Sequence, residues 1–145
     1  MHFKKFGAFI SILLLAGCAG EIPTLGVATG KLMQCPDKPN CVNSQETNEE
    51  HSIAPIVGYS TQADTKQQLI DILTNTSNAE IKEVKDDYIR AEFVSKIFRF
   101  VDDVEFYFPK TDSQEVIIHV RSASRVGHSD LGVNRDRIEE IRSQM

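Results

Sequence analysis

The chain has 145 residues, of which 41% are hydrophobic and 26% are charged, and its formal net charge is −5 at pH 7. This length predicts about one domain, and the composition is typical of a globular protein, which excludes wholesale disorder. The acidic balance argues against a nucleic-acid partner held by bulk positive charge, and no stretch reaches the roughly 20 apolar residues that cross a bilayer.

The N-terminus has the pattern of a secretory signal peptide. Lys4 and Lys5 form a short positive region, residues 8–15 form a compact apolar run, and Leu-Ala-Gly-Cys follows at residues 15–18. The apolar run is too short for a stop-transfer helix. The last four residues resemble the bacterial lipobox, in which the cysteine, here Cys18, is acylated and becomes the first residue of the mature protein. An ordinary signal peptide with an incidental cysteine, and a membrane helix, are the alternative interpretations.

Acylation of Cys18 predicts a lipoprotein of the cell envelope. Acyl chains such as palmitate contribute about 0.8 kcal/mol per buried methylene, so several of them anchor a chain stably in one leaflet. Residue 19 is Ala and not Asp, which in proteobacterial lipoproteins implies transfer to the outer membrane, so we expect anchoring on its periplasmic face. Cleavage of residues 1–17 removes two lysines and changes the formal charge from −5 to −7. The surface charge therefore adds no attraction to an anionic bilayer.

Residues 18–34 are predicted to be a lipidated tether, and residues 35–145 a single domain. From residue 19 to residue 34 the chain contains Gly, Pro and Thr without clear periodicity, as is typical of a flexible linker.

Two cysteines remain after Cys18, in the sequence Cys-Pro-Asp-Lys-Pro-Asn-Cys from Cys35 to Cys41. In an oxidising compartment two nearby thiols usually pair, so we expect a structural disulfide. A metal site that includes His51 and a redox-active pair are the alternatives. Metal coordination requires more soft ligands, and the spacing is not the Cys-x-x-Cys of redox motifs.

The periodicity of the remaining chain predicts an α+β domain. Ser60 or Thr61 can cap a helix that ends near residues 75–78. Strand-like runs follow at residues 80–84, 87–94, 97–108 and 115–121, and their short connections favour antiparallel neighbours. A second helix is expected to begin at Asn134 as its N-cap, with Val133 and Ile138 as a hydrophobic staple. The prediction is an antiparallel β-meander of about four to five strands, packed on one face by two helices.

Alternation along the strands assigns the two faces of this sheet. The face predicted to lie under the helices includes the even positions of the third run, which are Phe98, Phe100, Asp102, Val104, Phe106 and Phe108. Asp102 is the exception on this apolar side. Unless a bulge reverses the register there, its carboxylate needs a cation or several N–H donors, and Arg125 and Arg135 are the candidate partners.

The opposite face is unusually charged. It carries Arg90, Glu92, Arg99, Asp103, Glu105, Tyr107, His119 and Arg121. One interpretation is a solvated face with cross-strand ion pairs, each of which contributes little to stability. The other is a ligand-binding face.

A second concentration of polar side chains lies on the segment from Arg121 to Arg135, which leads into the last helix. It contains Arg121, Ser124, Arg125, His128, Asp130, Asn134 and Arg135. A helix N-terminus with nearby arginines suits an anion such as a carboxylate. Alternatively, these side chains fix the loop and the helix onto the sheet. A serine, a histidine and an aspartate close together on one segment are not evidence for a catalytic triad.

Three segments, residues 35–44, 98–106 and 121–135, resemble in sequence and order the domain of unknown function 1499 family. The resemblance covers roughly residues 32–143. It implies a bacterial protein, often a lipoprotein or otherwise membrane-attached, and it implies no established activity. His128 stands where the family commonly has Tyr, and Asn43 where Ser is common. The first difference argues against His128 as a required proton-transfer group.

Three functional hypotheses follow. The first is a non-enzymatic envelope lipoprotein that binds a small ligand, a lipid or an envelope protein. The second is an envelope enzyme that uses Asp102, Asp103 or Glu105 as general acid or base. The third is a purely structural role in envelope assembly. No cofactor or metal site is predicted. The candidate binding residues are Arg99, Asp102, Asp103, Glu105, His119, Arg121, Ser124, Arg125, His128, Asp130, Asn134 and Arg135.

Overall fold

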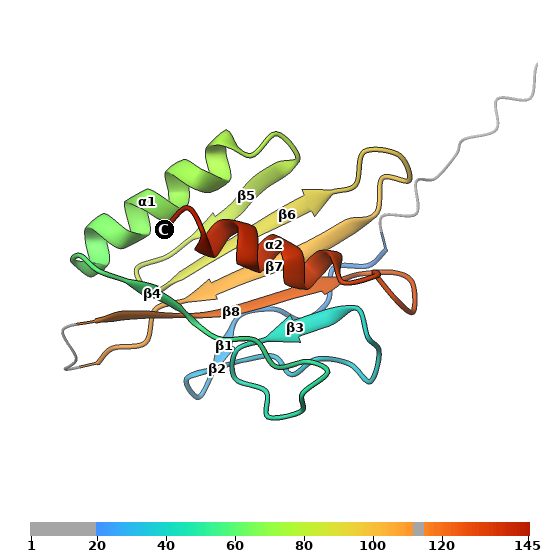
Figure 1. Cartoon of the computed structure of the whole chain (residues 1–145), viewed down its shortest axis with the longest axis horizontal. Helices are drawn as coiled ribbons and strands as arrows, with labels where there is room; N and C mark the ends of the chain where they lie inside the picture. Colours follow the sequence, from blue (N-terminus) through green and yellow to red (C-terminus); the bar gives the residue numbers. More distant parts are fainter. Residues whose placement is uncertain (1–19, 112–114) are drawn as a thin grey trace, which may run out of the picture.

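A computed structural model describes residues 20–111 and 115–145, and these residues form an antiparallel sheet with two helices on one face (Figure 1). The predicted lipidation site, Cys18, lies outside the described residues. The meander consists of β5 (Ala79–Val84), β6 (Tyr88–Val94), β7 (Val101–Tyr107) and β8 (Val116–Ser124). The helices are α1 (Gln62–Asn75) and α2 (Val133–Arg142). The predicted α+β fold with a β-meander is therefore confirmed.

Two short strands extend the meander along the free edge of β8. β3 (Cys41–Asn43) pairs with the C-terminal half of β8, and β4 (Ile56–Gly58) pairs with its N-terminal half. Since β8 has nine residues, both three-residue strands fit end to end along it. A separate hairpin consists of β1 (Val27–Ala28) and β2 (Lys31–Leu32). Segments of two or three residues are too short to show an alternating pattern, which is why the sequence did not predict them.

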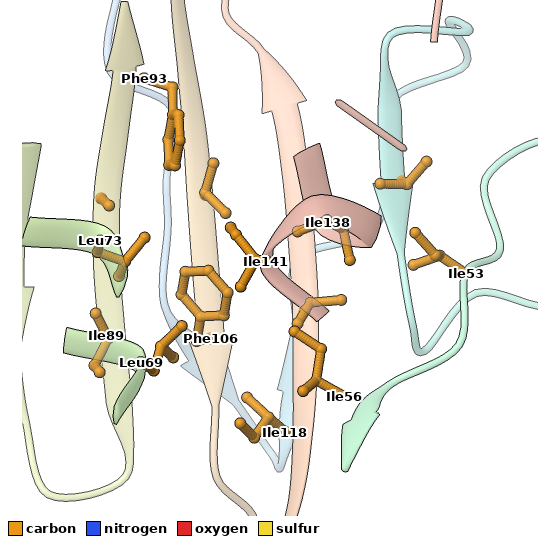
Figure 2. Packing of buried hydrophobic residues seen from close by; sticks show 14 of the residues in the cluster. Ile53, Ile56, Leu69, Leu73, Ile89, Phe93, Phe106, Ile118, Ile138 and Ile141 are labelled. Carbon is orange, nitrogen blue, oxygen red and sulfur yellow. The ribbon is translucent and has the colours of Figure 1, made fainter. Parts of the chain in front are cut away.

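The core lies between the sheet and the two helices. Leu69 and Leu73 of α1 and Ile138 and Ile141 of α2 pack around Phe106 of β7 (Figure 2). The expected start of α1 is confirmed, because the side-chain oxygen of its N-cap, Thr61, accepts a hydrogen bond from the backbone N–H of Asp64. None of the helices in the described parts of the chain has the length and hydropathy of a membrane span.

The third predicted strand is shorter than expected. β7 begins at Val101, and the preceding residues form the turn that connects it to β6. Val104, Phe106 and Phe108 are buried in the core as predicted, but Phe98 is 70% exposed and Phe100 is 42% exposed. The alternation of these residues with polar ones is typical of a strand, although no strand in the described part of the chain pairs with them.

The start of α2 also differs from the prediction. Its N-cap is Gly132, in the left-handed conformation at φ 86°, and the carboxylate of Asp130 accepts hydrogen bonds from the N–H groups of Gly132 and Asn134. Asn134 is therefore a helical residue with a buried side chain, and not the cap. Val133 is half exposed, so the predicted hydrophobic staple does not close.

The segment expected to be a flexible tether contacts the domain at Gly20, which lies against Arg125, and again from Gly26 onward. The N–H group of Gly26 donates to Glu105 on the sheet, and the N–H group of the buried Leu32 donates to Gln45. These contacts give residues 26–32 fixed partners, as a flexible linker would not have. The predicted disulfide is confirmed: the sulfur atoms of Cys35 and Cys41 are 2.03 Å apart.

Candidate functional site

Two carboxylates of β7 occupy the face of the sheet that points away from the helices. Asp103 and Glu105 are two residues apart, so strand alternation places them on the same face. The antiparallel register sets Glu105 between Arg90 of β6 and Arg121 of β8, and sets Asp103 opposite Glu92. Both carboxylates are buried, with 1% and 0% of the residue exposed. We call the resulting group of side chains the charged network: Arg90, Glu92, Asp103, Glu105, Arg121 and Arg125.

Glu105 joins three parts of the chain. Its Oε1 accepts hydrogen bonds of 2.8 Å from the N–H of Gly26 and from the hydroxyl of Tyr88, and its Oε2 accepts one of 3.2 Å from Arg121. Burial and the neighbouring Glu105 charge raise the pKa of Tyr88 well above its ordinary value. Tyr88 therefore remains protonated and is a permanent donor to this carboxylate.

Arg125 binds two of the acidic side chains at once. Its Nε and Nη2 donate to the two oxygens of Asp103 at 2.7 and 2.8 Å, and Nη2 also donates to Glu92 at 2.5 Å. The hydrogen bond with Asp103 raises the pKa of Arg125 despite its burial. Burial raises the pKa of the Glu92 carboxyl, but the hydrogen bond and charge of Arg125 outweigh it, and the net pKa is lowered. Such a bidentate arrangement favours a fixed ion pair.

The charged network contains three carboxylates and three guanidinium groups that are paired with one another. A general acid or base must instead face a substrate from which it takes, or to which it gives, a proton. In this arrangement Asp103 and Glu105 face arginines, and the N-terminal segment covers Glu105 through Gly26. The ion pairs and hydrogen bonds of the network therefore connect β6, β7 and β8 with the loop that follows β8 and with the N-terminal segment.

Asp102 points to the opposite face, toward α2. Its partner is Arg137, whose Nη2 lies 2.5 Å from its Oδ2, so the expectation of Arg125 or Arg135 was wrong. Arg137 is three residues after Asn134 on the helix and so shares its face, the one toward the sheet. Arg135 instead donates to the backbone carbonyls of Ser52 and Glu50.

A polar network under the N-terminal end of α2 surrounds this pair. The side-chain amide of Asn134 donates to Ser124, to Asp130 and to the carbonyl of Asn40 at 2.8–3.1 Å, and it accepts from Ser122. These bonds hold together the end of β8, the following loop, the loop closed by the disulfide and the helix. Ser124, Asp130 and Asn134 were predicted to bind a ligand, and the structure gives each of them a hydrogen-bond partner within the domain.

Three further candidates lie apart from both networks. His128 is exposed on the loop after β8. Arg99 lies in the turn between β6 and β7, because the strand it was assigned to begins two residues later. His119 is on the charged face, where its Nδ1 is 3.2 Å from the hydroxyl of Ser44 and its ring stacks on Tyr107. Burial lowers the pKa of His119.

A cavity of about 210 Å³ adjoins the charged network. Arg121, Arg125 and Asn40 line it together with Glu21 and Lys38 from the N-terminal segment and the disulfide loop. Within the described residues, Arg121 Nε and Asn40 Oδ1 are buried and have no hydrogen-bond partner. Asn40 was missed as a site residue, although it belongs to the motif between the two cysteines that carried the family resemblance.

A larger cavity of about 480 Å³ lies between the end of α1 and α2. Arg137, Asp136 and Glu140 of α2 line it on one side, and Asn75 and Ser77 on the other. The sequence interpretation assigned no role to this place, because the contact between the two helices depends on how both pack on the sheet. Among residues 20–111 and 115–145, no group of three or more His, Cys, Asp or Glu side chains is placed to hold a metal ion.

Comparison with known proteins gives one match. A family model described as Protein of unknown function (DUF1499) matches residues 31–145. This range includes the disulfide loop, the whole sheet from β3 to β8 and both helices. No curated protein and no solved structure matches the chain.

Proposed function

The chain belongs to the DUF1499 family of proteins of unknown function, and on that premise we propose that it is a lipid-anchored envelope protein that acts as a non-enzymatic binding or scaffold module. Acylated Cys18 anchors it, on the periplasmic face of the outer membrane where the host has one. The domain presents its exposed surfaces to a small ligand or to another envelope component.

The observation that supports this proposal is the mutual pairing of the charged network. Asp103 and Glu105 are almost fully buried and are bonded to Arg125 and Arg121. Removing one partner of such a pair leaves an uncompensated buried charge, so these residues are needed for the fold itself. Because the buried charges of the network bind one another, we expect the domain to contact its ligand or partner through exposed side chains elsewhere on its surface.

The network also supports a connection between the proposed anchor and the domain. Gly26 lies eight residues after Cys18, and its N–H is bound to Glu105. The anchored end of the chain is thereby fastened to the centre of the sheet.

Lipid anchoring is tested by the mass of the N-terminal peptide of the full chain purified from host membranes. The expected peptide begins at Cys18 and carries a thioether-linked diacylglyceryl group. The matched control is Cys18→Ala, which leaves the disulfide cysteines unchanged and is expected to lack the lipid and to leave the membrane fraction. An uncleaved, unmodified N-terminus in the native host would refute the anchor.

The alternative of an envelope enzyme has less support, because Asp102, Asp103 and Glu105 are all bonded to arginine. Asp102→Asn separates the two proposals, since it removes the ionisable group and keeps an acceptor for Arg137. Complementation of a deletion strain by this variant, at wild-type protein levels, is expected for a module. Loss of complementation with unchanged thermal stability would favour the enzyme.

A second candidate function, binding of a small anion, is favoured by the cavity beside the charged network. Arg121 Nε is a buried donor without a partner among the described residues, and Lys38 also lines the cavity. Acetate and inorganic phosphate are suitable probes, with the side-chain NMR signals of Arg121 and Asn40 as the readout. Saturable shifts that disappear in Lys38→Gln are expected for a site, and unchanged spectra would exclude these anions.

A further inference from the structure

The turn between β6 and β7 exposes apolar side chains that the fold does not bury. Ile97 is 82% exposed and Phe98 70%, and the rings of Phe98 and Phe100 stack with their centroids 5.5 Å apart. Lys96 precedes Ile97 and Phe98, and Arg99 lies between the two phenylalanines. A cluster of exposed apolar residues on a soluble domain marks a surface that contacts another molecule or a membrane.

Hydrogen bonds hold this turn in one conformation. The N–H of Ser95 donates to the carbonyl of Phe100 at 2.8 Å, and the N–H of Phe100 donates to the hydroxyl of Ser95 at 2.9 Å. Arg99 adopts a left-handed conformation at φ 58°, which is uncommon for a residue other than glycine. The apolar side chains are therefore displayed at a fixed place at the end of the sheet.

The turn lies at the same end of the molecule as the start of the described chain (Figure 1). A Cβ atom built on Gly20 would come within 2.9 Å of Arg125 Cβ, so Gly20 lies directly against that residue. The N–H of Arg125 in turn donates to the carbonyl of Val101 at 3.0 Å, next to Phe100. Cys18 precedes Gly20 by two residues and is therefore within about 7 Å of it.

We propose that residues 96–100 dock into the headgroup region of the membrane leaflet that holds the lipid of Cys18. The inference rests on the lipid anchor of the proposed function and adds an orientation to it. Phe98 and Ile97 would enter the interface, and Lys96 and Arg99 would face the phosphates of anionic lipids. Leu131 is 92% exposed on the loop after β8, and the last residue of β8, Ser124, pairs with Asp102 at the start of β7, so this loop is at the same end of the sheet and would extend the contact.

Charge complementarity favours a membrane over other occupants of this surface. The mature chain carries a formal charge of −7, since cleavage removes two lysines from a total of −5. Within the turn, however, both charged residues are cations. An anionic headgroup attracts this end of an otherwise acidic molecule, which turns the cationic tip toward the bilayer.

The chain contains no tryptophan, so a single introduced indole reports on membrane depth. The experiment uses the full lipidated chain in vesicles of phosphatidylethanolamine and phosphatidylglycerol, with brominated lipids as quenchers. Phe98→Trp is the test variant. Tyr59→Trp is the matched control, because Tyr59 is 87% exposed and follows β4, whose last residue pairs with the first residue of β8 at the opposite end of the sheet.

A blue shift and quenching in Phe98→Trp, together with unquenched Tyr59→Trp, are the expected result. Equal quenching of both variants, or quenching of neither in protein that floats with the vesicles, would overturn the docking. Protein that does not float would instead overturn the anchor and hence the proposed function. If Phe98→Trp does not fold, Ile97→Trp replaces it.

The cationic contribution is tested in the same system. Adding Lys96→Glu and Arg99→Glu to Phe98→Trp is expected to weaken the quenching while flotation persists. Replacing phosphatidylglycerol by phosphatidylcholine is expected to have the same effect. Unchanged quenching in both experiments, or concentration-dependent self-association that produces the blue shift without lipid, would refute a headgroup contact and point to a second copy of the chain as the occupant.

Discussion

Glu105 and Arg121 form a buried ion pair between neighbouring strands. Their burial determines how much each side chain contributes to the stability of the fold. Glu105 has no exposed surface, and it accepts bonds from Arg121, Tyr88 and Gly26. The desolvation cost of two buried charges is offset by the pair and its extra hydrogen bonds. At the residue scale this pair therefore behaves as part of a polar core, unlike a solvated surface pair.

Replacing Glu105 by Ala is expected to lower the free energy of unfolding by about 3–5 kcal/mol, because it leaves Arg121 buried without its partner. Glu105→Gln is expected to cost less, since an amide oxygen can still accept from Gly26. Urea unfolding measures both. The control is Glu80→Gln, whose side chain is 70% exposed in its pair with Lys82 and is expected to change stability by at most about 0.5 kcal/mol. Equal effects at both positions would contradict the role of burial.

His119 predicts a pH dependence of stability. Burial lowers its pKa below the ordinary value of 6.5, so near and below pH 6.5 the unfolded chain binds more protons than the folded one. The free energy of unfolding is then largest above pH 6.5 and decreases as the pH falls toward the folded-state pKa. Urea unfolding across this range measures the slope. His119→Gln, which keeps a polar partner for Ser44, is expected to flatten it, and an unchanged slope would refute the assignment.

At the scale of elements, polar side chains fix the position of α2. Asn134 connects the helix to β8 and to the disulfide loop, and Arg137 adds the bond to Asp102 together with a contact over the ring of Phe93. The helix is only ten residues long. Short helices are marginal alone, so these contacts and the burial of Ile138 and Ile141 decide that it forms.

Asp130→Ala tests how the start of α2 is stabilised. The carboxylate accepts from the N–H groups of Gly132 and Asn134, and loss of such a cap is expected to cost about 1 kcal/mol. Asp130→Asn keeps only one of the two acceptor oxygens, which bind the N–H groups of Gly132 and Asn134 separately, and is expected to fall between the wild type and Asp130→Ala by urea unfolding. Glu140→Ala, at an exposed position of the same helix, is the control. If Asp130→Ala is no more costly than Glu140→Ala, the carboxylate is not the cap.

At the scale of the whole molecule, the N-terminal segment is continuous with the sheet. Gly20 lies against Arg125, and Gly26 is bonded to Glu105. The link between a lipid on Cys18 and the folded domain is therefore short. A short link restricts how the domain sits on a membrane, whereas a long flexible one lets it rotate.

Lengthening this link is expected to let the domain change its orientation relative to the membrane. Insertion of about 24 Gly and Ser residues between Ala19 and Gly20 is expected to lower the effective concentration of the turn at the bilayer surface, because effective concentration falls with linker length. The prediction is weaker quenching of Phe98→Trp with unchanged flotation. An insertion of the same length in the exposed loop around residue 59 is the control. Loss of flotation would show instead that the insertion interferes with lipidation.

The disulfide, the first helix and the order of the meander strands were predictable because they depend on neighbours in the chain. Thr61 caps its own helix, Cys35 and Cys41 are six residues apart, and β5 to β8 are joined by short turns. The pairing of Asp102 with Arg137 was not predictable in this way. Its two residues are 35 positions apart, and several arginines were equally available on the sequence.

The amino-acid order by itself determined the α+β class, the alternation that separates the apolar face from the charged one, and the family resemblance, since these follow from local periodicity and short motifs. Only the tertiary structure decided that Asp103, Glu105 and Arg121 of the charged face are buried, that the N-terminal segment lies on Glu105, and that Phe98 and Phe100 are exposed. Burial and partner choice depend on which distant segments meet. That outcome is set by the packing of the whole chain and leaves no local signal in the sequence.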